Sequence, residues 1–174
     1  MDIWFTSDQH FDHKGIIGYC NRPFQTVDEM NHQLIYNHNK LIKSGDQVWH
    51  LGDFAWRTHS RFINLLNGQH FLIKGNHDHK TDLKNIVGFS KIERTAQIKV
   101  GNQLFWLSHF SHRVWPQSHF GSIHLYGHSH GSLPGLGRSM DVGVDTNGFR
   151  PYHLDEILAL FKAIPAHEID HHRS

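Results

Sequence analysis

The sequence has little cysteine, almost no net charge and no long apolar run. Cys20 is the only cysteine among 174 residues, which excludes an internal disulfide and fits a reducing compartment. Seventeen basic and 16 acidic side chains give a formal net charge of +1, so charge alone draws the chain neither to nucleic acid nor to anionic lipid. A membrane-spanning helix needs about 18 consecutive apolar residues, and no stretch approaches that length. Because residues 1–10 also lack the order of a signal peptide, we expect a cytoplasmic protein with no membrane contact and no extended nucleic-acid surface.

Histidine, by contrast, is several times more frequent than usual, with 19 residues. Imidazole is a common metal ligand, and its ordinary pKa lies closer to neutrality than that of any other side chain. The remaining composition, 38% apolar and 19% charged, is that of a globular chain. Its length predicts one domain over residues 1–165, followed by a frayed tail over residues 166–174, and leaves the oligomeric state open.

Apolar patterning predicts strands that alternate with helices in the first half of the chain. The predicted strands are residues 3–7, 47–51 and 70–74. A helix is expected from Thr26, with Glu29 completing a capping box, to about Ile42, and a shorter helix over residues 60–68. This alternation favours parallel βαβ units.

The second half of the chain has a different pattern. Two apolar segments flank Gly101 and Asn102 within residues 94–109, which favours a hairpin. The other expected elements are strands at residues 122–127 and 139–145 and a helix at residues 154–164. The chain is therefore predicted to be of the α/β class.

Five predicted strands end in residue types that bind metal ions. These residues are Asp8 and His10, then Asp53, Asn76 and His109, and finally His128 and His130. Glycine directly precedes three of these groups, at Gly52, Gly75 and Gly127, and permits the close backbone approach of a crowded site. Because ligand sites in parallel α/β sheets form beyond the carboxyl ends of the strands, the five ends predict one metal centre.

The same residues form a motif series, D-x-H, G-D, G-N-H-D, H and G-H-x-H, that resembles the calcineurin-like metallophosphoesterase superfamily. The motifs span residues 8–130, and the stretches YCNRPF (19–24) and VGVD (142–145) are similar to a small prokaryotic or phage-type branch. The resemblance implies an α/β fold, a four-layer α/β/β/α sandwich. The short spacings between the later motifs leave no room for a cap or accessory domain.

The resemblance also implies a centre of two divalent metal ions. One ion would be held by Asp8, His10 and His130, the other by Asn76, His109 and His128, and both by Asp53. His77 would be the catalytic histidine, oriented by Asp78. Carboxylate, imidazole and amide ligands suit Mn²⁺, with Fe, Zn²⁺ and Ni²⁺ as alternatives. Two such ions can clamp a phosphate and hold the hydroxide that attacks it.

Some of these roles have alternatives. Asp78 can instead cap a turn, and His77 can be a further ligand. His112 follows His109 by three residues but lies outside the strand end, so His109 is the preferred ligand. The candidate substrate contacts are Arg22, Arg113 and His13. Arginine pairs well with phosphate, although a solvated surface position is the favoured alternative for both arginines. The residues expected to pack internally are His50, His70, His124, Trp56 and Trp115.

The function implied is hydrolysis of small phosphodiesters, with a phosphomonoesterase that uses the same centre as the alternative. Few arginines lie near the motifs to neutralise a monoester dianion, and short loops leave room for the two substituents of a diester. A nuclease would need a basic track, which the charge balance does not indicate. A non-catalytic interaction module of the same fold should have lost ligands, whereas this chain has all of them.

Overall fold

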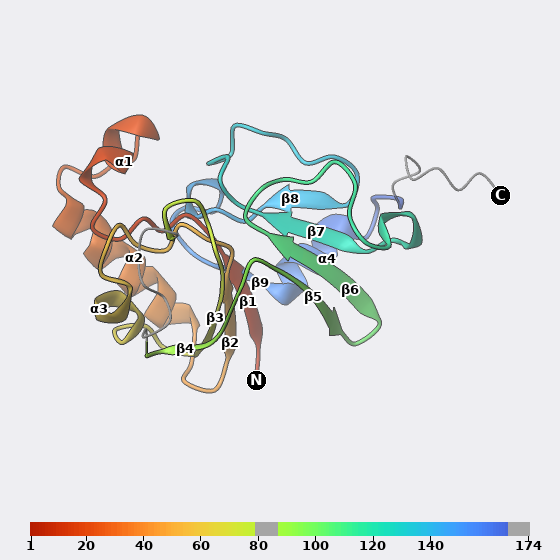
Figure 1. The fold of residues 1–174 in the computed structure, drawn as a ribbon, viewed down its shortest axis with the longest axis horizontal. Helices are drawn as coiled ribbons and strands as arrows, with labels where there is room; N and C mark the ends of the chain where they lie inside the picture. Colours follow the sequence, from red (N-terminus) through yellow and green to blue (C-terminus); the bar gives the residue numbers. More distant parts are fainter. Residues whose placement is uncertain (79–86, 167–174) are drawn as a thin grey trace.

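Two mixed β-sheets form the body of the protein. The computed structural model describes residues 1–78 and 87–166, and within them the sheet orders are β4-β3-β2-β1-β9 and β5-β6-β7-β8 (Figure 1). The strands of the first sheet are β1 (Ile3–Thr6), β2 (Gln47–His50), β3 (Gln69–Ile73), β4 (Phe89–Glu93) and β9 (Tyr152–His153). Those of the second sheet are β5 (Thr95–Val100), β6 (Gln103–Ser108), β7 (Ile123–Tyr126) and β8 (Ser139–Asp141).

Parallel pairing brings the carboxyl ends of β1, β2 and β3 to one edge of the first sheet. Phe5 lies beside Trp49 in the neighbouring strand, and Trp49 lies beside Phe71 in the next. The helices between these strands are α1 (Lys14–Tyr19), α2 (Val27–Leu41) and α3 (His59–Ile63). The predicted parallel βαβ arrangement is confirmed.

Helix α2 begins where the capping pattern places it. Thr26 is the N-cap, and its Oγ1 accepts a hydrogen bond of 3.1 Å from the backbone N–H of Glu29. Such a bond satisfies one of the donors that a helix start leaves without a partner. Met30 and Leu34, one turn apart, are buried against the first sheet and the loops beyond it. The helix therefore runs along the predicted apolar face and ends one residue before the predicted boundary.

The second sheet contributes two more strand ends. The predicted hairpin is confirmed, because β5 pairs with β6 in antiparallel register and Gly101 turns between them with φ +58°. The next pairs, β6 with β7 and β7 with β8, are parallel. The carboxyl ends of β6 and β7 therefore point the same way and can supply ligands to one site.

Two large apolar clusters of the described residues hold the layers together. Helices α1, α2 and α3 cover one face of the first sheet, and the second sheet lies on the other side (Figure 1). Between the sheets, Phe5 and Ile73 pack with Phe105 and Leu125, and helix α4 (Leu154–Phe161) adds Ile157 to the same core. The expected α/β sandwich of two mixed sheets is confirmed, with helices α1, α2 and α3 on the outer face of the first sheet.

The outer side of the second sheet carries a loop. His124 alternates with the inward-facing Ile123 and Leu125, and it is buried under Trp115, with ring centroids 5.3 Å apart. The segment 110–122 that supplies Trp115 contains one short 3₁₀ turn, η3 (Ser118–Phe120). Internal packing of His124 and Trp115 is as predicted.

Some elements differ from the sequence-based prediction. The helix expected over residues 60–68 is the shorter α3, and the strand expected to reach residue 145 ends at Asp141. Strands β4 and β9 and helix α1 were not predicted, since β4 is a half-exposed edge strand and α1 contains two glycines. Residues 167–174 of the predicted tail lie outside the described residues. Among the helices described, none has the length and apolar character that a membrane span requires.

Candidate metal centre

The predicted ligands meet at the carboxyl ends of five strands. Their side-chain nitrogen and oxygen atoms form overlapping groups within which all ligand atoms lie within 4.8 Å of one another. Three of these groups are Asp8 with His10 and His130, His10 with Asp53 and His77, and Asp53 with His109 and His128. Asn76 adjoins the third group, with its Oδ1 3.0 Å from His109 Nε2. Because His10 and Asp53 each belong to two groups, the residues form one continuous centre.

Most of these ligands have a strained backbone. Left-handed φ values occur at Asp8 (58°), His10 (52°), Asp53 (52°), His128 (68°) and His130 (47°). Such a conformation costs about 1 kcal/mol or more at a residue that is not glycine, and it persists where the surrounding structure imposes it. The surrounding structure therefore imposes backbone conformations that are unfavourable at these residues, and these conformations turn the side chains toward one point.

Glycine makes the close approach possible. A Cβ on Gly127 would overlap the Ser7 hydroxyl, and one on Gly75 would overlap the carboxylate of Asp53. Gly52, with φ +101°, would place a Cβ against the His109 ring. At all three positions the backbone lies so close to side chains of the centre that only glycine, which has no Cβ, fits.

The first ligand group has two buried atoms with no hydrogen-bond partner among the described residues, Asp8 Oδ1 and His10 Nε2. Asp8 Oδ1 lies 4.0 Å from both His10 Nε2 and His130 Nε2. Burial raises the pKa of Asp8 to about 8 and lowers the pKa of His10 far below its usual value. Unpartnered buried atoms are costly, and a cation placed among these three side chains would satisfy them.

Asp53 lies between the two halves of the centre. Its Oδ2 is 3.5 Å from His10 Nε2 and 3.6 Å from His109 Nε2. Burial raises the pKa of Asp53 to about 6, although a hydrogen bond from the backbone N–H of His77 opposes the shift. A single carboxylate oxygen thus faces ligands of both groups.

The second ligand group brings two acceptor atoms face to face. His109 Nδ1 donates to the carbonyl of Leu51 at 2.8 Å, so the neutral ring carries its lone pair on Nε2. Nε2 lies 3.0 Å from Asn76 Oδ1, which is also an acceptor. Two lone pairs at this distance attract a cation. Asn76 and His128 are exposed, so the centre opens to solvent on this side.

His77 and Asp78 have separate surroundings. The His77 side chain is 28% exposed, and its Nε2 is 3.9 Å from Asp53 Oδ2. Asp78 is fully buried and accepts hydrogen bonds from the backbone N–H groups of Asp53, Phe54 and Gly75 and from His59 Nε2. The expected orientation of the His77 ring by Asp78 is therefore corrected. The Asp78 carboxylate holds the backbone loop that carries Asp53. This role is closer to the alternative prediction, in which Asp78 caps a turn.

Arg22 also requires a correction. It is neither a solvated side chain nor a contact on the open side of the site, because its guanidinium is fully buried. Nη1 donates to the carbonyl of Gln9 and Nη2 to the carbonyl of Asp8, while Nε and Nη2 donate to the two oxygens of Asp145. Arg22 therefore holds the loop of Asp8 and Gln9 through the backbone carbonyls of these two residues.

Asp145 was missed by the sequence analysis. It lies in the 3₁₀ turn η4 (Val144–Thr146), and its Oδ2 accepts a hydrogen bond of 2.7 Å from His130 Nδ1. Burial raises the pKa of Asp145, but hydrogen bonds from His130 and Arg22 outweigh this and hold it below its usual value. The VGVD stretch, which contains Asp145, served in the sequence analysis only as a point of resemblance to a family, and Asp145 was assigned no role.

The other predicted contacts, His13 and Arg113, are more exposed than Arg22. His13 Nδ1 is 3.1 Å from His10 Nδ1, and the His13 ring stacks on Trp56 with centroids 4.3 Å apart. Arg113 is exposed. His112 accepts a hydrogen bond from Trp106 Nε1 and does not belong to any of the ligand groups. His109 is thus the residue that the strand end brings into the centre.

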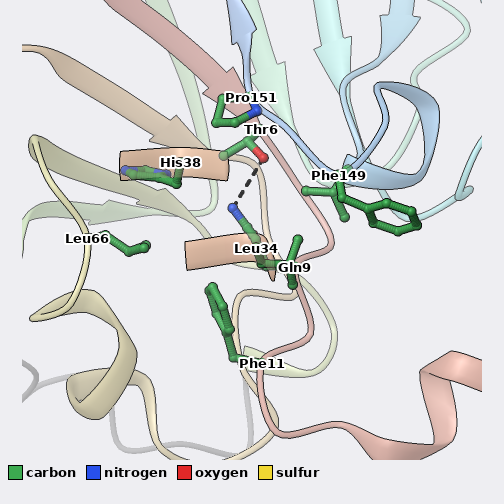
Figure 2. Close-up of a pocket in the computed structure, with 9 residues that line it drawn as sticks. Thr6, Gln9, Phe11, Leu34, His38, Leu66, Phe149 and Pro151 are labelled. Carbon is green, nitrogen blue, oxygen red and sulfur yellow. Dashed lines mark hydrogen bonds between the residues drawn. The ribbon is translucent and has the colours of Figure 1, made fainter. Parts of the chain in front are cut away.

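A series of buried, hydrogen-bonded side chains begins at Gln9, between Asp8 and His10 in the sequence. Gln9 Nε2 is 2.8 Å from His50 Nδ1, and His50 Nε2 is 3.0 Å from His70 Nδ1. Both histidines are buried in the interior, as predicted. Figure 2 shows the pocket beside Gln9, where its Nε2 also donates to Thr6 Oγ1 at 3.3 Å. None of the predicted ligands lines this pocket.

Comparisons with known proteins show relatives of this chain. No protein-family model matches the chain. The chain is 33% identical over 172 residues to the uncharacterized protein MJ1445 of Methanocaldococcus jannaschii, covering 92% of this chain and 91% of that protein. It is 29% identical over 203 residues to the gene 66 protein of Mycobacterium phage L5, covering 96% of this chain and 97% of that protein.

One solved structure shares the fold over most of both chains. The protein AQ665 from Aquifex aeolicus, of unknown function, superposes with a TM-score of 0.74 at 24% identity, covering 91% of this chain and 98% of that chain. The phosphoesterase YfcE of E. coli is more distant, with a TM-score of 0.46 at 18% identity over 82% of this chain and 78% of that chain. By its identity to MJ1445 over most of both chains, the chain belongs to the same family as that uncharacterized protein, and AQ665 shares its fold.

Proposed function

We propose that this protein is a metal-dependent phosphoesterase that hydrolyses small phosphodiesters. The convergence of seven ligand-type residues from five strand ends carries the proposal. The unpartnered Asp8 Oδ1 and His10 Nε2 support a cation on the buried side. The facing acceptors of His109 and Asn76 support a second cation on the open side.

In this proposal Asp8, His10 and His130 hold one divalent ion, and Asn76, His109 and His128 hold the other. Asp53 contributes to both, because its Oδ2 faces His10 and His109 at similar distances. Oxygen and imidazole ligands favour Mn²⁺, with Fe, Zn²⁺ and Ni²⁺ as alternatives. Bound here, such ions supply Lewis acidity toward a phosphate oxygen and activate water.

His77 is the proposed proton donor to the departing ester oxygen. Its ring is partly exposed, whereas the rings of His10 and His109 are almost fully buried. The hydrogen bond from its backbone N–H to Asp53 Oδ1, at 2.9 Å, keeps it beside the centre. A positioned acid of this kind contributes about 10²–10⁴-fold to the rate.

The preference for a diester rests on the supply of cationic side chains. A monoester dianion carries more charge on its oxygens and needs more donors. Arg22 is buried and already paired with Asp145, so it cannot serve that purpose, and Arg113 is the remaining arginine of the predicted contacts. Exposed Asn76 and His128 leave the open side accessible to two substituents.

The test compares bis(p-nitrophenyl) phosphate with p-nitrophenyl phosphate at saturating Mn²⁺. We expect a higher kcat/KM for the diester, and we expect His77→Gln to lose about 10²–10⁴-fold in rate while it keeps its metal. His32→Gln, at an exposed position of α2, is the matched control. A clear preference for the monoester would contradict the diester assignment. Full activity after exhaustive chelation would contradict the metal centre.

A further inference from the structure

Asp145 uses both carboxylate oxygens on two partners, Arg22, which is 123 residues away in the sequence, and His130, which is 15 residues away. Oδ1 accepts from Arg22 Nε at 2.8 Å. Oδ2 accepts from Arg22 Nη2 and from His130 Nδ1, each at 2.7 Å. The guanidinium therefore grips the carboxylate in a fork, and this planar, two-bond geometry is specific to arginine.

The contact with His130 determines where that ring carries its proton. A carboxylate only accepts hydrogen bonds, so His130 Nδ1 must be the donor. In the neutral ring the lone pair then lies on Nε2, which faces Asp8 Oδ1 at 4.0 Å. Nε2 is thereby left available as a ligand atom on the side of the centre.

Arg22 links this contact to a second ligand of the same group. Besides Asp145, it donates to the backbone carbonyl of Asp8 at 2.7 Å and to that of Gln9 at 3.0 Å. The buried guanidinium of Arg22 thus fixes both the Asp8 loop and the Asp145 carboxylate. His130 itself has a left-handed backbone, which needs such external support.

We propose that Asp145, held by Arg22, is a positioning residue that sets the tautomer and orientation of His130 toward the centre. The inference rests on the metal centre proposed above. It also extends that centre to residue 22, between the first two motifs, and to residue 145, beyond the last. Groups that orient a ligand histidine typically account for about 10–100-fold in metal affinity.

The first test uses the metal-free, full-length protein. Nitrogen-15 NMR of the histidine rings at mildly alkaline pH, with His130→Gln to assign the signals, reports which nitrogen carries the proton. We expect His130 to be protonated on Nδ1 in the wild type and to lose this preference in Asp145→Asn. A wild-type His130 with its proton on Nε2 would overturn the proposal, whatever the variants do.

The second test is Mn²⁺ binding by calorimetric titration. We expect Asp145→Asn to bind Mn²⁺ about 10–100-fold more weakly. The matched control is Asp155→Asn, because Asp155 is 81% exposed and lies 3.6 Å from the Nδ1 of another histidine, His153. Equal affinity in both variants would refute the positioning role. A protein without phosphoesterase activity that passes both tests would contradict the proposed function and leave this inference standing.

Discussion

His38 should make the fold sensitive to acid, independently of the candidate centre. It lies on α2 and is buried, and its Nε2 donates to the carbonyl of Asn67 at 2.8 Å. The rings of His50 and His70 lie 6.3 Å and 5.7 Å away, centroid to centroid. Burial lowers the pKa of His38 to about 4, because a charged ring would lose its hydration there.

The sign follows from comparing the folded and unfolded chains. The unfolded ring has a pKa of about 6.5, so between that value and about 4 the unfolded state binds more protons than the folded state. Stability contributed by the neutral ring is therefore complete above pH 6.5 and is lost as the pH falls toward 4. For these two pKa values the loss between pH 7 and pH 5 is about 2 kcal/mol.

The perturbation is His38→Gln, which retains an N–H donor for Asn67 but does not titrate in this range. Urea unfolding at pH 7 and pH 5, in the presence of chelator, measures the free energy of unfolding. We expect the wild type to lose about 2 kcal/mol more than the variant between the two pH values. His32→Gln, exposed on the same helix, should follow the wild type. Identical pH dependence in the wild type and His38→Gln would refute the reasoning.

Three further outcomes are expected. Chelation should lower the melting temperature as well as abolish turnover, because the ligands come from distant segments and binding to the folded state stabilises it; calorimetry showing no change would contradict this. Asp53→Asn should reduce metal content and rate more than Asn76→Ala does, because Asp53 faces ligands of both groups and carries a charge; the reverse order in metal analysis would rule out a shared ligand. Asp78→Asn should lower the free energy of unfolding by about 1–3 kcal/mol, since an amide nitrogen would replace one of its two acceptor oxygens; an unchanged urea midpoint would contradict the role as a loop anchor.

Much of the fold and the centre can be predicted from local sequence. Thr26 and Glu29 mark a helix start because capping involves neighbouring residues. The candidate ligands can likewise be predicted, since each follows the end of its strand and parallel strands bring their carboxyl ends to one edge. The glycines at 52, 75 and 127 stand out for the same reason, because a missing Cβ is a property of the residue itself.

Only the tertiary structure decided the partners of the buried charges. Arg22 and Asp145 are 123 residues apart, and residue type alone favours an exposed position for each. Asp78 adjoins His77 in the sequence, yet its carboxylate turns back to the loops of Asp53, because several backbone donors converge there. Long-range contacts of this kind leave no periodic signal in the chain, since each depends on two segments that only folding brings together.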